Sequence, residues 1–235
     1  MAVLTQLPWR AAKARAPLRL VWVLALALAT VVLAAPDFDR LLSAFSQRWG
    51  VGTPMQRYVA WREMALASAS GTEPDRLKRV NEFFNRHIVF GEDTVIWGQA
   101  DYWATPLETL GRGAGDCEDF AIAKYFSLRM LGVASHKLRL IYVRARTGGG
   151  DAAPTQAHMV LAYYAQPDAE PLVLDNLIGD IRLASRRPDL TPVFSFNSEG
   201  VFVGAATKDA AAPGGLSRLS RWEDLLRRAH AEGFE

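Results

Sequence analysis

Cysteine is scarce in this sequence, because Cys117 is the single cysteine among 235 residues. One cysteine excludes an internal disulfide, so a fold held together by disulfides is excluded as well. The four histidines are scattered, and with one cysteine they offer no ligand spacing for a zinc site. A thiol without a disulfide or metal partner is either a small buried hydrophobe or a reactive group. Cys117 is therefore the first residue to interpret.

A strong charge of either sign is also lacking. The chain has 27 basic and 25 acidic residues, a net charge of +2. Residues 1–34 hold four of the basic residues and no acid, so the rest of the chain has 23 basic and 25 acidic residues. The apparent basicity thus belongs to the N-terminus, and it gives no support for nucleic-acid binding.

No apolar run reaches the ~20 residues that a membrane-spanning helix needs. The longest, residues 20–33 (LVWVLALALATVVL), is apolar except for Thr30 and follows a basic stretch. The small residues Ala34 and Ala35 come next, and this order is typical of a secretory signal. We expect residues 1–35 to be a signal peptide cut near Ala34 or Ala35, with an uncleaved inner-membrane anchor as the alternative.

The remaining chain is rich enough in apolar residues to form a core, since half of all residues are hydrophobic. We expect one folded domain over residues 36–205, then a linker and an amphipathic helix within residues 206–235. Helices are predicted at 37–50, 53–70, 73–87 and 117–131, a loop-like segment at 91–112, and strands at 138–145, 157–164, 171–175, 193–196 and 200–203. Helices followed by an antiparallel sheet indicate an α+β fold.

Three residues on these elements suggest nucleophilic chemistry. Cys117 begins a helix, where the helix dipole favours a thiolate. His158 and Asp175 lie on successive predicted strands, which can place a base beside the group that orients it. Taken alone, each residue is better explained as a core cysteine, a core histidine or a turn aspartate. Together, in this order, they predict a Cys–His–Asp triad.

Several motifs extend this pattern. They are Trp97-Gly98, residues 101–108 (DYWATPLE), residues 115–119 (GDCED), residues 121–124 (AIAK), residues 157–161 (AHMVL) and residues 174–176 (LDN). On these motifs the chain resembles the bacterial transglutaminase-like cysteine proteinases over roughly residues 75–205. Within that family it is similar to the LapG-type periplasmic proteases that cleave adhesins.

The resemblance implies a papain-like or transglutaminase-like cysteine endopeptidase, with a helical lobe whose central nucleophile helix packs on an antiparallel sheet. It implies Cys117, His158 and Asp175 as the triad, and cleavage of the N-terminal region of a large surface adhesin near paired alanines, which controls biofilm attachment. Calcium dependence and sequestration by an inner-membrane receptor for cyclic diguanylate are implied as well. A transglutaminase-like acyl transferase, a cell-wall amidase and an inactive binding module remain alternatives.

Three acids surround the candidate nucleophile. Asp116, Glu118 and Asp119 should oppose formation of a thiolate at Cys117, because like charges disfavour each other. Helix capping explains these acids from the residues alone. The resemblance instead implies that Asp116 and Glu118, with Asp119 as a further candidate, bind calcium, whose preferred ligands are oxygens.

The segment upstream of Cys117 supplies two further candidates. Gln99 and Trp103 lie where this class of enzyme often keeps a side chain that stabilises the oxyanion. Packing of an aromatic loop over the core is the alternative. Two basic residues on the nucleophile helix, Lys124 and Arg129, are predicted to be solvated.

Overall fold

The computed structural model describes residues 36–148, 154–204 and 215–234. The predicted signal segment and the linker at 205–214 lie outside these residues. The described residues belong to one compact unit. None of the described helices is both long enough and apolar enough to cross a membrane.

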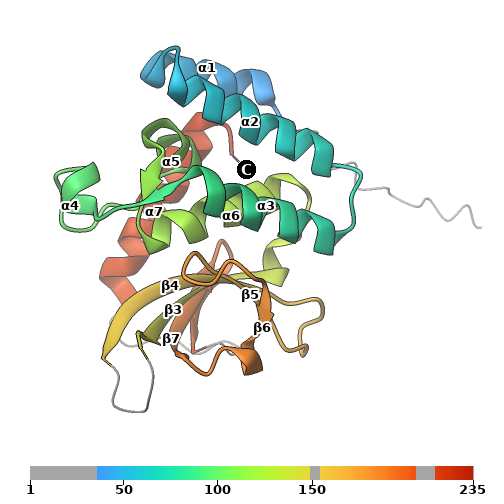
Figure 1. Cartoon of the computed structure of the whole chain (residues 1–235), viewed down its shortest axis with the longest axis vertical. Helices are drawn as coiled ribbons and strands as arrows, with labels where there is room; N and C mark the ends of the chain where they lie inside the picture. Colours follow the sequence, from blue (N-terminus) through green and yellow to red (C-terminus); the bar gives the residue numbers. More distant parts are fainter. Residues whose placement is uncertain (1–35, 149–153, 205–214, 235) are drawn as a thin grey trace, which may run out of the picture. The chain divides into compact units, whose positions relative to one another are not determined.

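Three N-terminal helices confirm the predicted ones to within two residues: α1 (Phe38–Trp49), α2 (Thr53–Ser68) and α3 (Glu73–His87). Their starts have local causes. Asp37 accepts a hydrogen bond from the first turn of α1, and Thr72 forms a capping box with Asp75 at the start of α3. In Figure 1 these helices lie on one side of the sheet, as a helical layer.

The predicted loop at 91–112 is wrong in part. It contains the short helices α4 (Asp93–Ile96) and α5 (Pro106–Arg112). Thr105 and Glu108 form a capping box at the start of α5, and Pro106 occupies a first-turn position. Gly113 ends α5 in the left-handed conformation, with φ of 69°. The segment was predicted as a loop with aromatic residues, and the helix start signal at Thr105 and Pro106 was overlooked.

Helix α6 (Cys117–Met130) is the central helix predicted from its apolar circumference. It packs against α3 and α5 on one side and against β4 and β3 of the sheet on the other. Trp61 of α2 donates a hydrogen bond of 2.9 Å to Ser127 in the last turn of α6. The N-terminus of this helix, where Cys117 lies, is therefore fixed at the boundary between the helices and the sheet.

The main sheet has six antiparallel strands in the order β6-β5-β4-β3-β7-β8. The strands are β3 (Leu138–Arg146), β4 (Thr155–Tyr163), β5 (Leu172–Leu174), β6 (Arg182–Leu183), β7 (Leu190–Asn197) and β8 (Gly200–Val203), with single 3-10 turns at Ser135–Lys137 and Ala184–Arg186. All five predicted strands are present. Sequence reasoning missed β6 and a second, parallel pair, β1 (Val89–Phe90) with β2 (Ala114–Gly115), because each of these has two residues.

The predicted C-terminal amphipathic helix is α7 (Gly215–Glu232), which has 18 residues. Trp222 and Leu225 are buried in the same core as α2 and α6. The Trp222 indole donates a hydrogen bond of 3.1 Å to the carbonyl of Asn197, at the end of β7. Figure 1 shows α7, in red, running from the sheet alongside the helical layer.

Candidate active site

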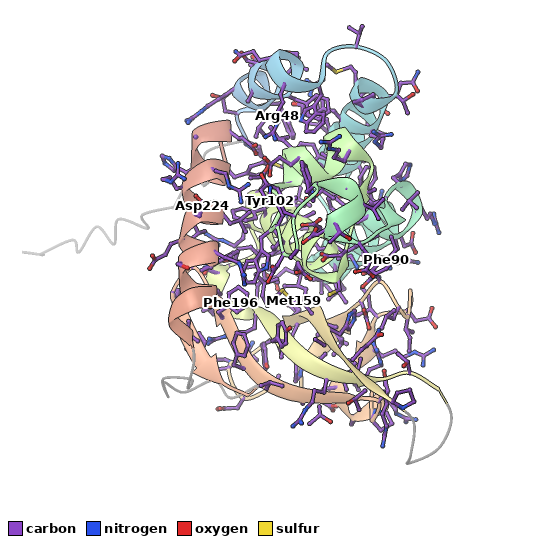
Figure 2. All side chains as sticks on the ribbon, turned by 90° about the vertical axis from the view of Figure 1, so that its left-hand side faces the viewer. Arg48, Phe90, Tyr102, Met159, Phe196 and Asp224 are labelled. Carbon is purple, nitrogen blue, oxygen red and sulfur yellow. The ribbon has the colours of Figure 1, made fainter. Side chains whose placement is uncertain are left out.

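A cleft of about 560 Å³ opens where the N-terminus of α6 meets the sheet. Cys117 from α6 and His158 from β4 both line it, and so do Asn176 and Leu177, which follow β5. Met159, the neighbour of His158, lies at the level where the helices meet the sheet in Figure 2. The fold thus brings the predicted nucleophile and the predicted base to one cleft.

The predicted base is paired with the predicted orienting residue. His158 Nε2 lies 2.7 Å from Asp175 Oδ1, and both side chains are buried. A second donor, the Leu177 N–H, lies 3.1 Å from the same oxygen. With the Nε2 proton directed at Asp175, the neutral imidazole keeps its lone pair on Nδ1, where it can accept a proton.

An arginine that sequence reasoning missed completes the surroundings of Asp175. Arg187 Nη2 donates to Asp175 Oδ2 at 2.7 Å and to Asp189 Oδ2 at 2.8 Å, and the guanidinium is buried. Burial alone would raise the pKa of Asp175, but hydrogen bonds from His158 and Arg187 lower it to about 2. Asp175 is therefore a firmly ionised carboxylate. In the sequence, nothing distinguishes the Arg186-Arg187 pair from two solvated residues of a turn, so Arg187 was missed.

Lys124 corrects another prediction, because it is buried rather than solvated. Its Nζ donates to the main-chain carbonyl of Asp175 at 3.1 Å. The reason is the position of α6, which is covered on all sides in the middle of the unit and leaves no solvated face at this turn. Arg129, near the end of the same helix, is half-buried and donates to the carbonyl of Val133.

The buried acidic surroundings of Cys117 oppose ionisation of its thiol. Cys117 Sγ lies 3.0 Å from Glu118 Oε2. Burial raises the pKa of the Cys117 thiol, the negative charges of Glu118 and Asp116 raise it further, and the Met159 N–H opposes them. In this arrangement the thiol stays protonated until the negative field is offset.

Acidic side chains gather beside the thiol, as predicted, but the cluster is larger than the sequence suggested. Carboxylate oxygens of Asp93, Asp116 and Asp119 lie within 4.8 Å of one another, and Asp93, Asp101 and Glu118 form an overlapping group. Asp93 and Asp101 were missed. Parallel pairing of β1 with β2 explains the proximity of Asp93, because it places the residues after Phe90 beside those after Gly115.

The cluster is only half satisfied by hydrogen bonds. The N–H of Tyr102 donates to Asp93 Oδ2, and that of Ala104 donates to Asp119 Oδ1 at 2.8 Å. One oxygen of each of three acids is buried and has no hydrogen-bond partner: Asp93 Oδ1, Asp116 Oδ1 and Asp119 Oδ2. Such oxygens are costly to bury unless something binds them.

The electrostatics agree with this geometry. Burial raises the pKa of Asp93 to about 6, and burial also raises those of Asp116 and Asp119, with the neighbouring acids adding to each effect. Asp116 occupies the N-cap position of α6, yet its side chain makes no capping hydrogen bond. The capping explanation thus fails for Asp116. Clustered oxygen ligands without partners fit a hard cation such as Ca²⁺.

Comparison with known proteins identifies the family. A model for bacterial transglutaminase-like cysteine proteinases matches residues 59–188. The chain belongs to this family. It is therefore a cysteine protease, and the fold and family expected from the motifs are confirmed. No curated protein matches the chain.

Solved structures of Legionella pneumophila LapG are similar over most of this proteinase. One is 36% identical, covers 83% of this chain and 99% of its own, and has a TM-score of 0.68. A calcium-bound form covers 81% and 97%, at 36% identity and a TM-score of 0.67. An EGTA-treated form covers 83% and 100%, also at 36% identity, with a TM-score of 0.69.

The two oxyanion candidates of this proteinase lie elsewhere. Gln99 and Trp103 line a separate cavity of about 250 Å³ beside α7, and neither lines the cleft of Cys117. Trp103 is buried and stacks on Phe196, with ring centroids 5.5 Å apart. Figure 2 places Phe196 near the base of α7. This packing matches the alternative explanation, an aromatic segment over the core.

Proposed function

We propose that this proteinase is a calcium-dependent periplasmic endopeptidase that cleaves the N-terminal region of a large surface adhesin, near paired alanines, and so controls biofilm attachment. One observation carries the proposal. A single cleft brings Cys117 together with His158, which is paired with Asp175, and with Asp116, which has a buried oxygen without a partner. The similarity to LapG, which has calcium-bound and EGTA-treated structures, supports it.

In the proposed reaction, Cys117 is the nucleophile and His158 the base. The Cys117 proton passes to His158 Nδ1, and the sulfur attacks the peptide carbonyl. Asp175 holds the imidazole by Nε2 and stabilises the imidazolium that forms. The first-turn N–H groups of α6 have no intrahelical acceptor, so they can stabilise the oxyanion beside Cys117.

Attack of the sulfur on the carbonyl forms a tetrahedral intermediate, and its breakdown releases the two products in turn. The carbon–nitrogen bond breaks as His158 returns its proton to the leaving amine, which leaves an acyl-thioester on Cys117. Water then attacks the thioester while His158 accepts one of its protons. The carbon–sulfur bond breaks, the proton passes to the sulfur, and the free acid departs.

The acids beside Cys117 are the proposed calcium ligands. The predicted residues Asp116, Glu118 and Asp119, together with Asp93, offer the clustered oxygens. When bound, the ion supplies a positive charge that offsets the field of the acids and fixes the loop before α6. Glu118 also contacts the Cys117 thiol. If its carboxylate bound the ion instead, its negative charge would no longer lie uncompensated beside the sulfur.

Location and partner are proposed from the sequence. The basic and apolar order of residues 10–35 supports export to the periplasm. N-terminal sequencing of the protein from the cell envelope tests it, with a start near Ala35 expected. An uncut Met1 in a cytosolic fraction would refute export.

For the receptor, we expect the periplasmic domain of an inner-membrane cyclic-diguanylate sensor to inhibit cleavage when added to the purified enzyme.

Mass spectrometry of an adhesin N-terminal fragment, incubated with purified protein and calcium, tests the activity directly. Two peptides split near paired alanines are expected. The Cys117→Ala variant should leave the fragment intact. A labelled amine added to the same reaction tests acyl transfer. Transfer of this label in place of hydrolysis would refute the endopeptidase.

A further inference from the structure

The main chain at Asp175 is anchored from behind the cleft by two side chains. Lys124 of α6 and Asn85 of α3 both donate to the Asp175 carbonyl, at 3.1 Å and 2.8 Å. Asn81, one turn before Asn85, donates to the carbonyl of Gly179 at 2.8 Å. The segment that follows β5 is thus held from the side of the helical layer at two points.

Lys124 is tied to the nucleophile through its own helix. It follows Cys117 by seven residues, which places both on one face of α6, two turns apart. The same helix therefore presents the thiol to the cleft at its start and an ammonium group to the carbonyl of Asp175 further along. This is a short, rigid connection between the nucleophile and the residue that orients the base.

Such a lysine opposes stability. Its side chain is 1% exposed, and burial lowers the pKa of Lys124 to about 7, against the opposing influence of the Asp175 charge. A methionine has a similar volume and no charge to desolvate, so it would suit the site better by packing alone. A buried group that costs stability and contacts the triad segment points to a role in activity.

We propose that Lys124 is a positioning residue. Its hydrogen bond to the Asp175 carbonyl fixes the position of the Asp175–His158 pair relative to Cys117. The inference rests on the roles proposed above for these three residues. It adds a fourth side chain, which touches no substrate and acts through the main chain of Asp175.

The pH dependence of Cys117 alkylation by iodoacetamide, with calcium present, tests this role without a substrate. In the wild type the alkylation midpoint should lie below the ~8.5 of a free thiol, because the imidazolium stabilises the thiolate. In Lys124→Met the midpoint should rise towards that value, and alkylation at neutral pH should slow about 10-fold. The melting temperature should stay equal or rise. Lys78→Met, an exposed position on α3, is the matched control and should change neither quantity.

A second variant covers failure of the first to fold. Asn85→Ala removes the other donor to the same carbonyl and should shift the midpoint in the same direction by less. An unchanged profile in folded Lys124→Met overturns the inference, as does an unchanged profile in Asn85→Ala if Lys124→Met does not fold. A wild-type midpoint already at the free-thiol value would instead overturn the proposed triad, and the role of Lys124 with it.

Discussion

The two sides of the Cys117 cleft differ in how their carboxylates are satisfied. On the sheet side, both oxygens of Asp175 accept hydrogen bonds, from His158, the Leu177 N–H and Arg187. On the helix side, Asp93, Asp116 and Asp119 each keep one buried oxygen without a partner. Burial acts in the same direction on the carboxylates of both sides, but only those of the sheet side have partners that offset it.

The pKa values express the same contrast. Hydrogen bonds from positive partners lower the pKa of Asp175 to about 2, whereas burial among like charges raises that of Asp93 to about 6. The sheet side is complete with protein groups alone. On the helix side, a bound cation would favour ionisation of all the acids at neutral pH. The contrast between the two sides can be tested by variants and conditions that act on one side only.

Loss of the thiol or of the base should have the largest effect. We expect Cys117→Ala and His158→Ala each to lower kcat by about 10⁴-fold or more, and the double variant by little more, since the residues act as a unit. Peptide release followed by mass spectrometry measures this, and circular dichroism checks the fold. Cleavage by Cys117→Ala at near the wild-type rate would refute the triad.

Removal of calcium should stop cleavage while leaving the sheet side intact. We expect a selective chelator to abolish activity, and Ca²⁺ to restore it better than Mg²⁺, which prefers a smaller octahedral shell. Activity assays on protein whose metal content is verified by elemental analysis measure this. Full cleavage by metal-free protein would show that the acids have no metal role in activity.

A matched variant gives the same test in stability. Asp93→Asn should raise the melting temperature of the chelated protein, because it removes one of the mutually repelling charges. With saturating Ca²⁺ the same variant should lower it, because a ligand is lost. If the melting temperature shifted in the same direction with chelator and with Ca²⁺, Asp93 would be excluded as a calcium ligand.

Loss of Arg187 should damage the sheet side alone. Arg187→Met leaves Asp175 and Asp189 without their shared partner. We expect a stability loss of about 3–5 kcal/mol and, in the folded fraction, a kcat reduced ~10²-fold through the displaced base. Urea unfolding and kinetics measure the two effects. Calcium affinity should not change, and an equal loss of it would contradict the separation of the two sides.

The pH dependence of stability should reveal the acidic side. Because the folded pKa of Asp93 is raised to about 6, and those of Asp116 and Asp119 are raised too, the metal-free protein binds protons more tightly than its unfolded chain. Its stability should therefore fall as pH rises from 5 to 8. The contribution of Asp175 is lost only as pH falls towards 2. Melting temperatures with chelator and with calcium measure this, and saturating calcium should flatten the fall.

The smallest effect is expected at Gln99, which is exposed beside α7 and does not line the cleft. Gln99→Ala should change kcat by less than about 2-fold, since one lost oxyanion donor costs ~10²–10³-fold. Kinetics under saturating substrate check this. A loss near the larger value would restore Gln99 as an oxyanion residue.

Local signals explain why so much of the fold could be predicted. Neighbouring residues encode the start of α2 at Thr53, the start of α3 after Thr72 and the apolar circumference of α6. The strands that follow α6 appear in the sequence as apolar runs. The short strands β1, β2 and β6 were missed for the same reason, because a strand of two residues shows no periodic pattern of apolar side chains.

The site divides in the same way. The sequence by itself determined Cys117, His158 and Asp175 as candidates and the acids adjacent to the thiol, because these belong to contiguous motifs. Only the tertiary structure decided the rest. Asp93 reaches Asp116 through the parallel pairing of β1 with β2, and Arg187 and Lys124 reach Asp175 from a distant turn and from the core helix. Such contacts join residues far apart in the chain, and side chains of the same types elsewhere are solvated, so residue type alone cannot distinguish them.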